Sequence, residues 1–128
     1  MTSSFDAERE LTLSTLSRAV QSFAKDRSWE EFHDPKNLSM ALASEVGELV
    51  ALLRWVSNAE ADAALESGAK RDALESEIGD VGICLFLLCA RARIDLGSAI
   101  LEKLRRNASK YPIETSRGHA DPPVDANR

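Results

Sequence analysis

The sequence predicts an all-α fold, a bundle of four main helices, on two observations. Apolar residues recur at spacings of three and four along most of the 128-residue chain, as they do on one face of a helix. No segment shows the strict alternation of apolar and polar residues that indicates a half-buried strand. A chain of this length is expected to form one domain with a hydrophobic core.

Composition narrows the class of protein. The chain is 44% hydrophobic and 29% charged, with a net charge of −5, which argues against non-specific binding to nucleic acid or to an anionic membrane. We expect neither a signal peptide nor a membrane span, because the longest apolar run, residues 81–90, is about half a span. Cys84 and Cys89 lie in that run on different sides of a helix, which indicates free thiols and a cytoplasmic protein.

The first helix is expected from about Phe5 to Asp26, with a narrow apolar stripe of the bundle type. Residues 27–36 break this pattern and end in Asp34-Pro35. Because a proline disfavours the helical conformation at the residue before it, we expect a loop or short turn here. That turn carries an unusual aromatic load, Trp29, Phe32 and His33.

The second helix is expected from Asn37, a favourable N-cap, to about Ser57. Residues 58–69 are a polar connection with room for one short helix. The third helix, about Lys70 to Arg93, is apolar on nearly all sides after Asp80. A helix of that kind is buried on all sides, so we expect it at the centre of the bundle or against another subunit.

The fourth helix is expected to begin after Asp95, its N-cap, and to end near Lys110, before Pro112. Residues 113–128 show no periodicity and are expected to be a disordered tail. The predicted organisation is therefore one all-α domain over residues 1–112, followed by this tail.

Two acidic pairs, Glu45-Glu48 and Glu77-Asp80, are the most specific feature of the chain. Each pair is spaced i, i+3, so its carboxylates share one helix face, and each lies in an apolar run. A solvated acidic face is the usual fate of helical glutamates, but the apolar neighbours argue against it. Burying like charges is prohibitive without neutralisation, and oxygen ligands favour Mg²⁺, with Mn²⁺ possible.

Each acidic pair also contains a glycine, Gly47 or Gly79. A glycine inside a helix costs about 1 kcal/mol relative to alanine, so both positions call for an explanation. Close packing of the two helices is one, and it would also bring the two acidic pairs within reach of the same ions.

Aromatic and basic residues suggest how a nucleotide could bind. Trp55 follows Glu48 by seven residues, nearly in line and about 10 Å further along the helix. It could stack on a base whose phosphates reach the ions, or it could be a core or interface tryptophan. On the last helix, Lys103, Asn107 and Lys110 share a face that suits a polyphosphate, although cations there also interact favourably with the helix dipole.

Taken together, residues 23–112 resemble the MazG-type all-α nucleoside triphosphate pyrophosphohydrolases, and within them the dCTP pyrophosphatase branch. The stretches that carry the resemblance are Trp29 to His33 with Pro35 and Asn37, Glu45 to Leu49, Trp55, Glu77 to Val81, and Lys103 with Asn107 and Tyr111-Pro112.

The resemblance implies Mg²⁺-dependent hydrolysis of (deoxy)nucleoside triphosphates, dCTP or related pyrimidine nucleotides first, to the monophosphate and pyrophosphate. It implies a homotetramer, a dimer of dimers with sites between subunits. The implied metal ligands are Glu45, Glu48, Glu77 and Asp80; Trp29, His33 and Trp55 would surround base and sugar, and Lys103, Asn107 and Tyr111 would contact phosphate and sugar.

One position departs from the branch. Cys84 lies one turn past Asp80, where this branch often carries a tyrosine, so we count Cys84 among the substrate-binding residues that set selectivity. No activated nucleophile is evident, so water is the expected nucleophile, oriented by Glu45 or Glu48. The alternative is a non-catalytic helical oligomerisation or regulatory module with a structural divalent ion, which would need neither Trp55 nor the basic face.

Overall fold

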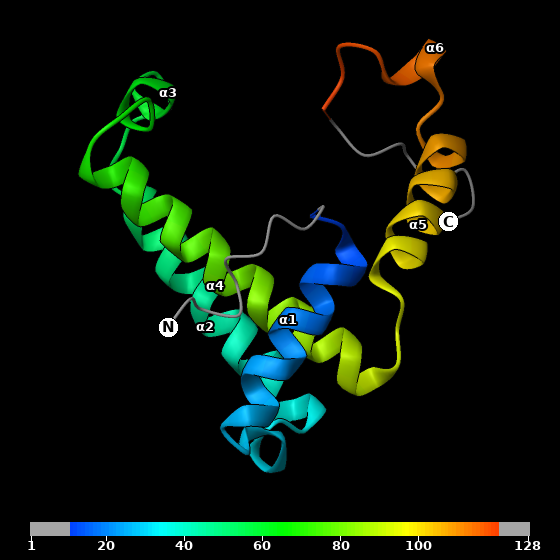
Figure 1. Ribbon diagram of the computed structural model, residues 1–128. Helices are drawn as coiled ribbons and strands as arrows, with labels where there is room; N and C mark the ends of the chain where they lie inside the picture. Colours follow the sequence, from blue (N-terminus) through cyan, green and yellow to red (C-terminus); the bar gives the residue numbers. More distant parts are fainter. Residues whose placement is uncertain (1–10, 121–128) are drawn as a thin grey trace. The chain divides into compact units, whose positions relative to one another are not determined.

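The computed structural model describes residues 11–120, and within them every regular element is helical, which confirms the predicted all-α fold. The chain divides into two compact units, residues 1–94 and 95–128. The first unit contains α1 (Leu13–Asp26), the 3₁₀ helix η1 (Trp29–Phe32), α2 (Pro35–Leu53), α3 (Ala61–Ala64) and α4 (Ala69–Ala92), and the second contains α5 (Leu96–Lys110) and α6 (Ile113–Ser116) (Figure 1).

Helix α1 begins at Leu13, so the prediction that Leu11 and Thr12 are helical is wrong. Thr12 has an extended backbone and caps the helix. The Thr12 hydroxyl accepts a hydrogen bond from the Thr15 N–H at 3.1 Å, and the Thr15 hydroxyl accepts one from the Thr12 N–H at 2.9 Å. These reciprocal bonds satisfy two backbone donors that a helix start otherwise leaves unpaired. Residues 5–10 of the predicted helix lie outside the described residues.

Helix α2 begins at Pro35, two residues before the predicted N-cap. Asp34 is the cap instead, since its carboxylate accepts a hydrogen bond from the Asn37 N–H at 2.8 Å. A proline is well suited to the first helical position, and it favours the extended backbone that Asp34 adopts. The Asn37 side chain donates to the Phe32 carbonyl at 3.0 Å and so joins α2 to η1.

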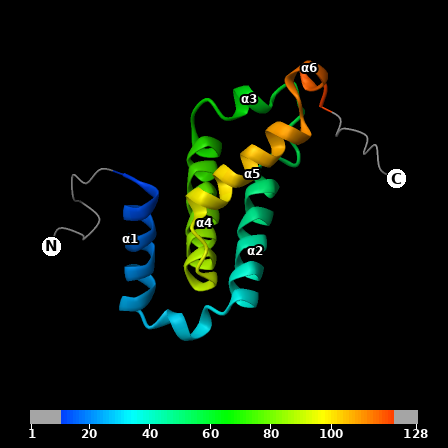
Figure 2. The same ribbon diagram turned by 90° about the vertical axis from the view of Figure 1, so that its right-hand side faces the viewer.

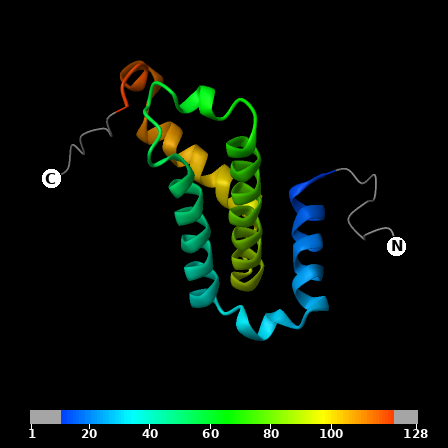
Figure 3. The same ribbon diagram turned by 90° about the vertical axis from the view of Figure 1, so that its left-hand side faces the viewer.

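Helix α4 is the central helix of the first unit, one of the two places its apolar sequence predicted, but the predicted burial on all sides is wrong within the described chain, since none of its residues is buried. It lies between α1 and α2, and its most extensive contact is with α2, to which it runs antiparallel (Figures 2 and 3). The short helix expected in the connection between α2 and α4 is α3. Two side chains tie the ends of α4 to distant carbonyls: Lys70 Nζ donates to Leu52 O at 3.0 Å, and Arg91 Nη1 donates to Glu30 O at 3.2 Å.

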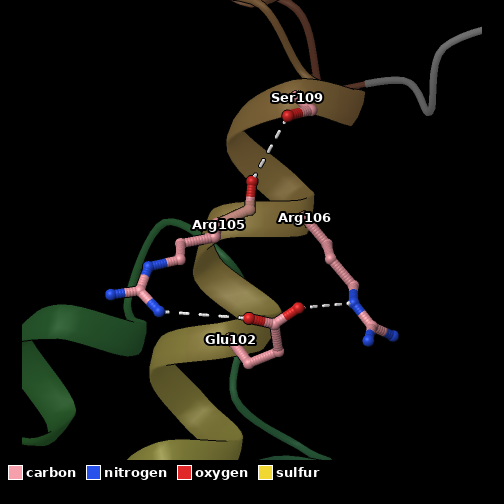
Figure 4. A network of polar contacts seen from close by, with 4 residues as sticks. All are labelled: Glu102, Arg105, Arg106 and Ser109. Carbon is pink, nitrogen blue, oxygen red and sulfur yellow. Dashed lines mark hydrogen bonds and ion pairs between the residues drawn. The ribbon is translucent and has the colours of Figure 1, made fainter.

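The second unit is built on α5, whose N-cap is Asp95 as predicted: its carboxylate accepts from the Ser98 N–H at 2.8 Å. Hydrogen bonds from Ser98 lower the pKa of Asp95. Further along α5, Glu102 accepts a hydrogen bond from Arg106 at 3.0 Å and lies 4.0 Å from Arg105 (Figure 4).

The segment expected to be a disordered tail opens with the one-turn helix α6. Residues 121–128 of that segment lie outside the described residues. The division into a domain of residues 1–112 and a tail of residues 113–128 stays a prediction.

The first unit does not close the expected hydrophobic core by itself. Among the described residues only Ala24 and Leu38 are buried, each 2% exposed, and no large side chain is fully buried. Three helices side by side form a single layer, which cannot cover both of its faces. Apolar side chains therefore stay exposed on α2 and α4, including Met40, Val46, Val50, Ile78 and Ile83. Within residues 11–120, no helix is both long enough and apolar enough to cross a membrane.

Candidate active site

An acidic cluster lies between α2 and α4. Carboxylate oxygens of Glu45, Glu48 and Glu77 all lie within 4.8 Å of one another. The antiparallel packing of the two helices produces this cluster, because it sets the middle of one helix against the middle of the other. Three of the four predicted metal ligands are thus brought together by the fold.

Asp80, the fourth predicted ligand, is outside this tight group but close to it. Its negative charge contributes to raising the pKa of both Glu45 and Glu77. It lies three residues after Glu77 on the same face of α4, where a fourth carboxylate can join the other three around an ion.

The cluster contains two carboxylate oxygens that lack a partner. Oε2 of Glu45 and Oε2 of Glu77 are shielded from solvent and accept no hydrogen bond from the described residues. A shielded acceptor without a partner is costly, and more so when it is charged. A divalent cation would satisfy both oxygens, and the donor set, made only of carboxylates, fits a hard ion.

The raised pKa values in the cluster agree with a site that a divalent cation would neutralise. Desolvation is the main cause that raises the pKa of Glu45, and the charge of Glu48 adds to it; the same two causes raise the pKa of Glu77. Desolvation also raises the pKa of the Cys84 thiol, followed by the charges of Glu45 and Asp80. Cys84 therefore lies beside the cluster as a protonated thiol, which does not suit it as a nucleophile.

The two glycines do not serve close packing within the chain. A Cβ added at Gly47 or at Gly79 would meet no atom within 4 Å. The explanation by close contact of α2 and α4 is therefore wrong. Among the described residues, nothing lies close enough to either position to require a glycine there.

Two of the predicted base-binding residues, Trp29 and His33, meet within the first unit, whereas Trp55 lies at the other end of α2. Trp29 packs edge-on against Phe23 and His33, with ring centroids 5.7 Å and 6.4 Å apart. Trp55 follows the end of α2, is 84% exposed, and has the Arg54 guanidinium over its ring at 4.8 Å. Trp29 precedes and Trp55 follows the 19-residue helix α2, which is about 28 Å long.

The predicted phosphate-binding residues belong to the second unit. Lys103 and Asn107 line a shallow depression on α5, and Lys103 forms no ion pair with any residue in the 11–120 range. The Tyr111 N–H donates to the Asn107 carbonyl at 2.8 Å, and the Lys110 ammonium lies 5.6 Å from the Tyr111 ring. Arg105 and Arg106 face Glu102 instead, so Lys103 is better placed than either arginine to meet a phosphate.

Sequence reasoning missed a cavity of about 290 Å³ in the first unit. Its lining comes from α1, η1, α2 and α4, so no local motif could reveal it, and the only signal was the aromatic and histidine content of the predicted turn. The lining residues are Gln21, Ala24, Glu30, His33, Leu38, Leu87, Ala90 and Arg91.

The fold has a close counterpart among solved structures. The crystal structure of a pyrophosphatase from Archaeoglobus fulgidus superposes with a TM-score of 0.74 at 33% sequence identity, over 83% of this chain and 97% of that one. A strand-free helical fold with acidic pairs facing each other from antiparallel helices defines the class of all-α nucleoside triphosphate pyrophosphohydrolases.

Curated relatives narrow the class. The chain is 42% identical to dCTP pyrophosphatase 1 of Rattus norvegicus over 116 residues, which is 91% of this chain and 68% of the relative. It is also 42% identical to dCTP pyrophosphatase 1 of Bos taurus over 119 residues, 93% of this chain and 70% of the relative. No family model matches the chain. The chain belongs to the dCTP pyrophosphatase family, as the motifs predicted.

The raised pKa values predict how the metal-free protein responds to pH. Glu45 and Glu77 hold protons more tightly when folded than when unfolded, so this contribution to stability is complete below their ordinary pKa of 4.5. It is lost as pH rises through the raised values, because the folded state then gives up its extra protons. Urea unfolding in EDTA between pH 4 and 8 measures the effect.

The control for this experiment is Glu45→Gln, which cannot titrate at that position. The free energy of unfolding of the wild type should fall relative to this variant as pH rises, and added Mg²⁺ should reduce the fall. A wild-type stability that rises with pH relative to Glu45→Gln would contradict the prediction.

Proposed function

We propose that the protein hydrolyses dCTP or a related pyrimidine deoxynucleotide to the monophosphate and pyrophosphate with Mg²⁺ as the cofactor. The observation that carries the proposal is the trio of carboxylates within 4.8 Å in a chain 42% identical to proteins named dCTP pyrophosphatase 1. Two shielded oxygens in that trio require a cation, and a triphosphate brings further negative charge that a cation must offset.

The metal ligands in this proposal are Glu45, Glu48, Glu77 and Asp80. Bound Mg²⁺ would supply positive charge that lowers the pKa of water and offsets the charge of the triphosphate and the leaving pyrophosphate. Glu45 or Glu48 would orient the attacking water and accept its proton. The thiol of Cys84 is held neutral, so we expect water rather than this thiol to attack.

The remaining predicted residues recognise the nucleotide. Trp29, His33 and Trp55 surround the base and sugar. Stacking on an indole tolerates any base, so selectivity depends on the size of the pocket and on hydrogen bonds to the base edge. Cys84 borders the acidic cluster and is smaller than a tyrosine, which leaves space in the pocket. Lys103, Asn107 and Tyr111 contact phosphate and sugar.

The proposed active unit is a homotetramer, a dimer of dimers. Three features of the single chain support association with further copies. Apolar side chains on α2 and α4 are exposed to solvent, at a cost that burial against another subunit removes. Gly47 and Gly79 are open to close approach from outside the chain. Trp29 and Trp55 lie at opposite ends of α2, so both can reach one base only if a second copy contributes one of them.

Membership of an enzyme family argues against the alternative, a non-catalytic helical module with a structural ion. Both cysteines are free in the structure, in keeping with a reducing compartment. We accordingly place the protein in the cytoplasm.

Product analysis tests the proposal. Purified protein incubated with Mg²⁺ and dCTP, dTTP, dUTP or dATP should release pyrophosphate and the monophosphate, with the highest kcat/KM for dCTP. Because the pyrimidine bases differ from one another by small groups, the preference for dCTP over the other pyrimidine nucleotides should be on the order of 1–3 kcal/mol. In Cys84→Tyr, the same panel of nucleotides should show a stronger preference for dCTP.

Release of orthophosphate and the nucleoside diphosphate, without pyrophosphate, would refute the reaction. A purine preference would refute the choice of substrate and leave the reaction standing. Unchanged ratios in Cys84→Tyr would remove Cys84 from the pocket.

Glu48→Gln should abolish turnover and weaken Mg²⁺ binding while leaving the fold intact. It removes one charge from the acidic cluster, so repulsion in the metal-free protein is relieved and the melting temperature in EDTA should be equal to or above that of the wild type. Glu75→Gln is the matched control, because Glu75 is an exposed acid on α4 that pairs with Arg71 at 2.7 Å. Turnover of Glu48→Gln within about tenfold of wild type would exclude Glu48 from the metal site.

Val50→Asp should shift the protein from tetramer to smaller species in light scattering coupled to size-exclusion chromatography. Val50 is apolar and 55% exposed on α2, and a charge buried at an interface without a partner is strongly unfavourable. Ser39→Asp, an exposed polar position on the same helix, is the control and should leave the tetramer intact. A monomeric wild type would overturn the proposed assembly.

A further inference from the structure

Arg91 forms a bond that joins two distant parts of the first unit. Its Nη1 donates to the carbonyl of Glu30 at 3.2 Å, across 61 positions of sequence. Arg91 lies in the last turn of α4, whereas Glu30 is in η1, the short helix between α1 and α2. A cation near a helix C-terminus commonly interacts with the carbonyls of its own helix, but this one reaches a different element.

The Glu30 carbonyl also belongs to the backbone of η1 itself. It accepts the hydrogen bond of the His33 N–H at 3.2 Å, so Arg91 and His33 share one acceptor. Glu30 follows Trp29 directly, and the Trp29 ring packs edge-on against the His33 ring at 6.4 Å. The position of this single carbonyl is therefore linked to Trp29, the first residue of η1, and to His33, which directly follows η1.

Helix α1 also restrains the turn, since the Phe23 ring packs edge-on against the Trp29 ring at 5.7 Å. Ser28, which precedes η1, adopts a left-handed backbone with φ of 55°, a conformation unfavourable for a residue with a side chain. A single-turn 3₁₀ helix is held weakly by its own hydrogen bonds. From α2, the Asn37 side chain holds the Phe32 carbonyl at 3.0 Å, and from α4 Arg91 holds the Glu30 carbonyl.

We infer that Arg91 is a positioning residue for the substrate: it anchors η1 to the end of α4 so that Trp29 and His33 are held ready for the base and sugar. Glu30, His33 and Arg91 line the same cavity, which places the anchor next to the side chains that it positions. The inference rests on the proposed function, because Trp29 and His33 bind the substrate only there. Arg91 itself does not contact the reacting atoms.

Arg91→Met removes the donor and keeps an apolar stem of similar length. Loss of an interaction that serves binding alone raises KM and leaves kcat unchanged. We expect KM for dCTP to rise about fivefold, with kcat within about twofold and the Mg²⁺ dependence unchanged. Arg91→Lys, which retains a cation and donors, should recover part of the loss. The matched control is Arg71→Met on the same helix, where the arginine pairs only with exposed Glu75.

A second measurement follows η1 without relying on turnover. The chain has two tryptophans, so in a Trp55→Phe background all indole fluorescence comes from Trp29. Adding Arg91→Met to that background should raise the acrylamide quenching constant of Trp29, because the loosened turn exposes the ring. Adding Arg71→Met should leave the constant unchanged.

The outcomes distinguish the two proposals. If wild type releases no pyrophosphate from any nucleotide, the proposed function fails, and the positioning role fails with it, even if the quenching shift shows that Arg91 anchors the turn. If wild type is active but Arg91→Met matches Arg71→Met in KM and in quenching, the positioning role is overturned. A lower melting temperature with a lower kcat and an unchanged KM would also overturn it, since it would show a general loss of structure.

Discussion

The repulsion among four carboxylates held between two helices is the constraint on which the rest of this structure depends. Glu45, Glu48 and Glu77 lie within 4.8 Å of one another, and Asp80 adds its charge. Nothing in the cluster offsets that charge, so the packing of α2 against α4 must hold it in place. Lys70 and Arg91 act at the two ends of α4, far from the acids. Lys70 thus fastens the start of α4 to α2, Arg91 fastens its end to η1, and neither cation pairs with the acidic cluster.

The single layer of helices in the first unit explains why the acidic residues meet while large apolar side chains stay exposed. It is sufficient to bring the acids together, because only α2 and α4 are needed for that. It is not sufficient to bury large apolar side chains, of which the described residues contain none that is fully buried. It also leaves Trp29 and Trp55 at opposite ends of one helix. The exposure of apolar side chains and the separation of Trp29 from Trp55 both follow from the single-layer arrangement of the first unit.

Much of the fold and site was predictable because it depends on local sequence. Helical periodicity gave the positions of α2, α4 and α5, and the i, i+3 spacing placed each acidic pair on one face. The errors in element boundaries fell at helix ends. Asp34 is the cap of α2, where Asn37 had been expected, because several neighbouring residues can offer a capping hydrogen bond and the local backbone decides which one forms. The role given to Gly47 and Gly79 failed because packing partners are not a local property.

The proposed ligands, four carboxylates in two apolar helices, could be predicted from the order of residues, since spacing along a helix determines which side chains share a face. Their convergence was not, because it requires the antiparallel register of α2 and α4. The bond from Arg91 to Glu30 spans 61 positions, and no periodic pattern connects residues so far apart. Local sequence determines which chemical groups a helix presents, whereas contacts distant in sequence arise only when whole helices pack, and those contacts decide which groups meet.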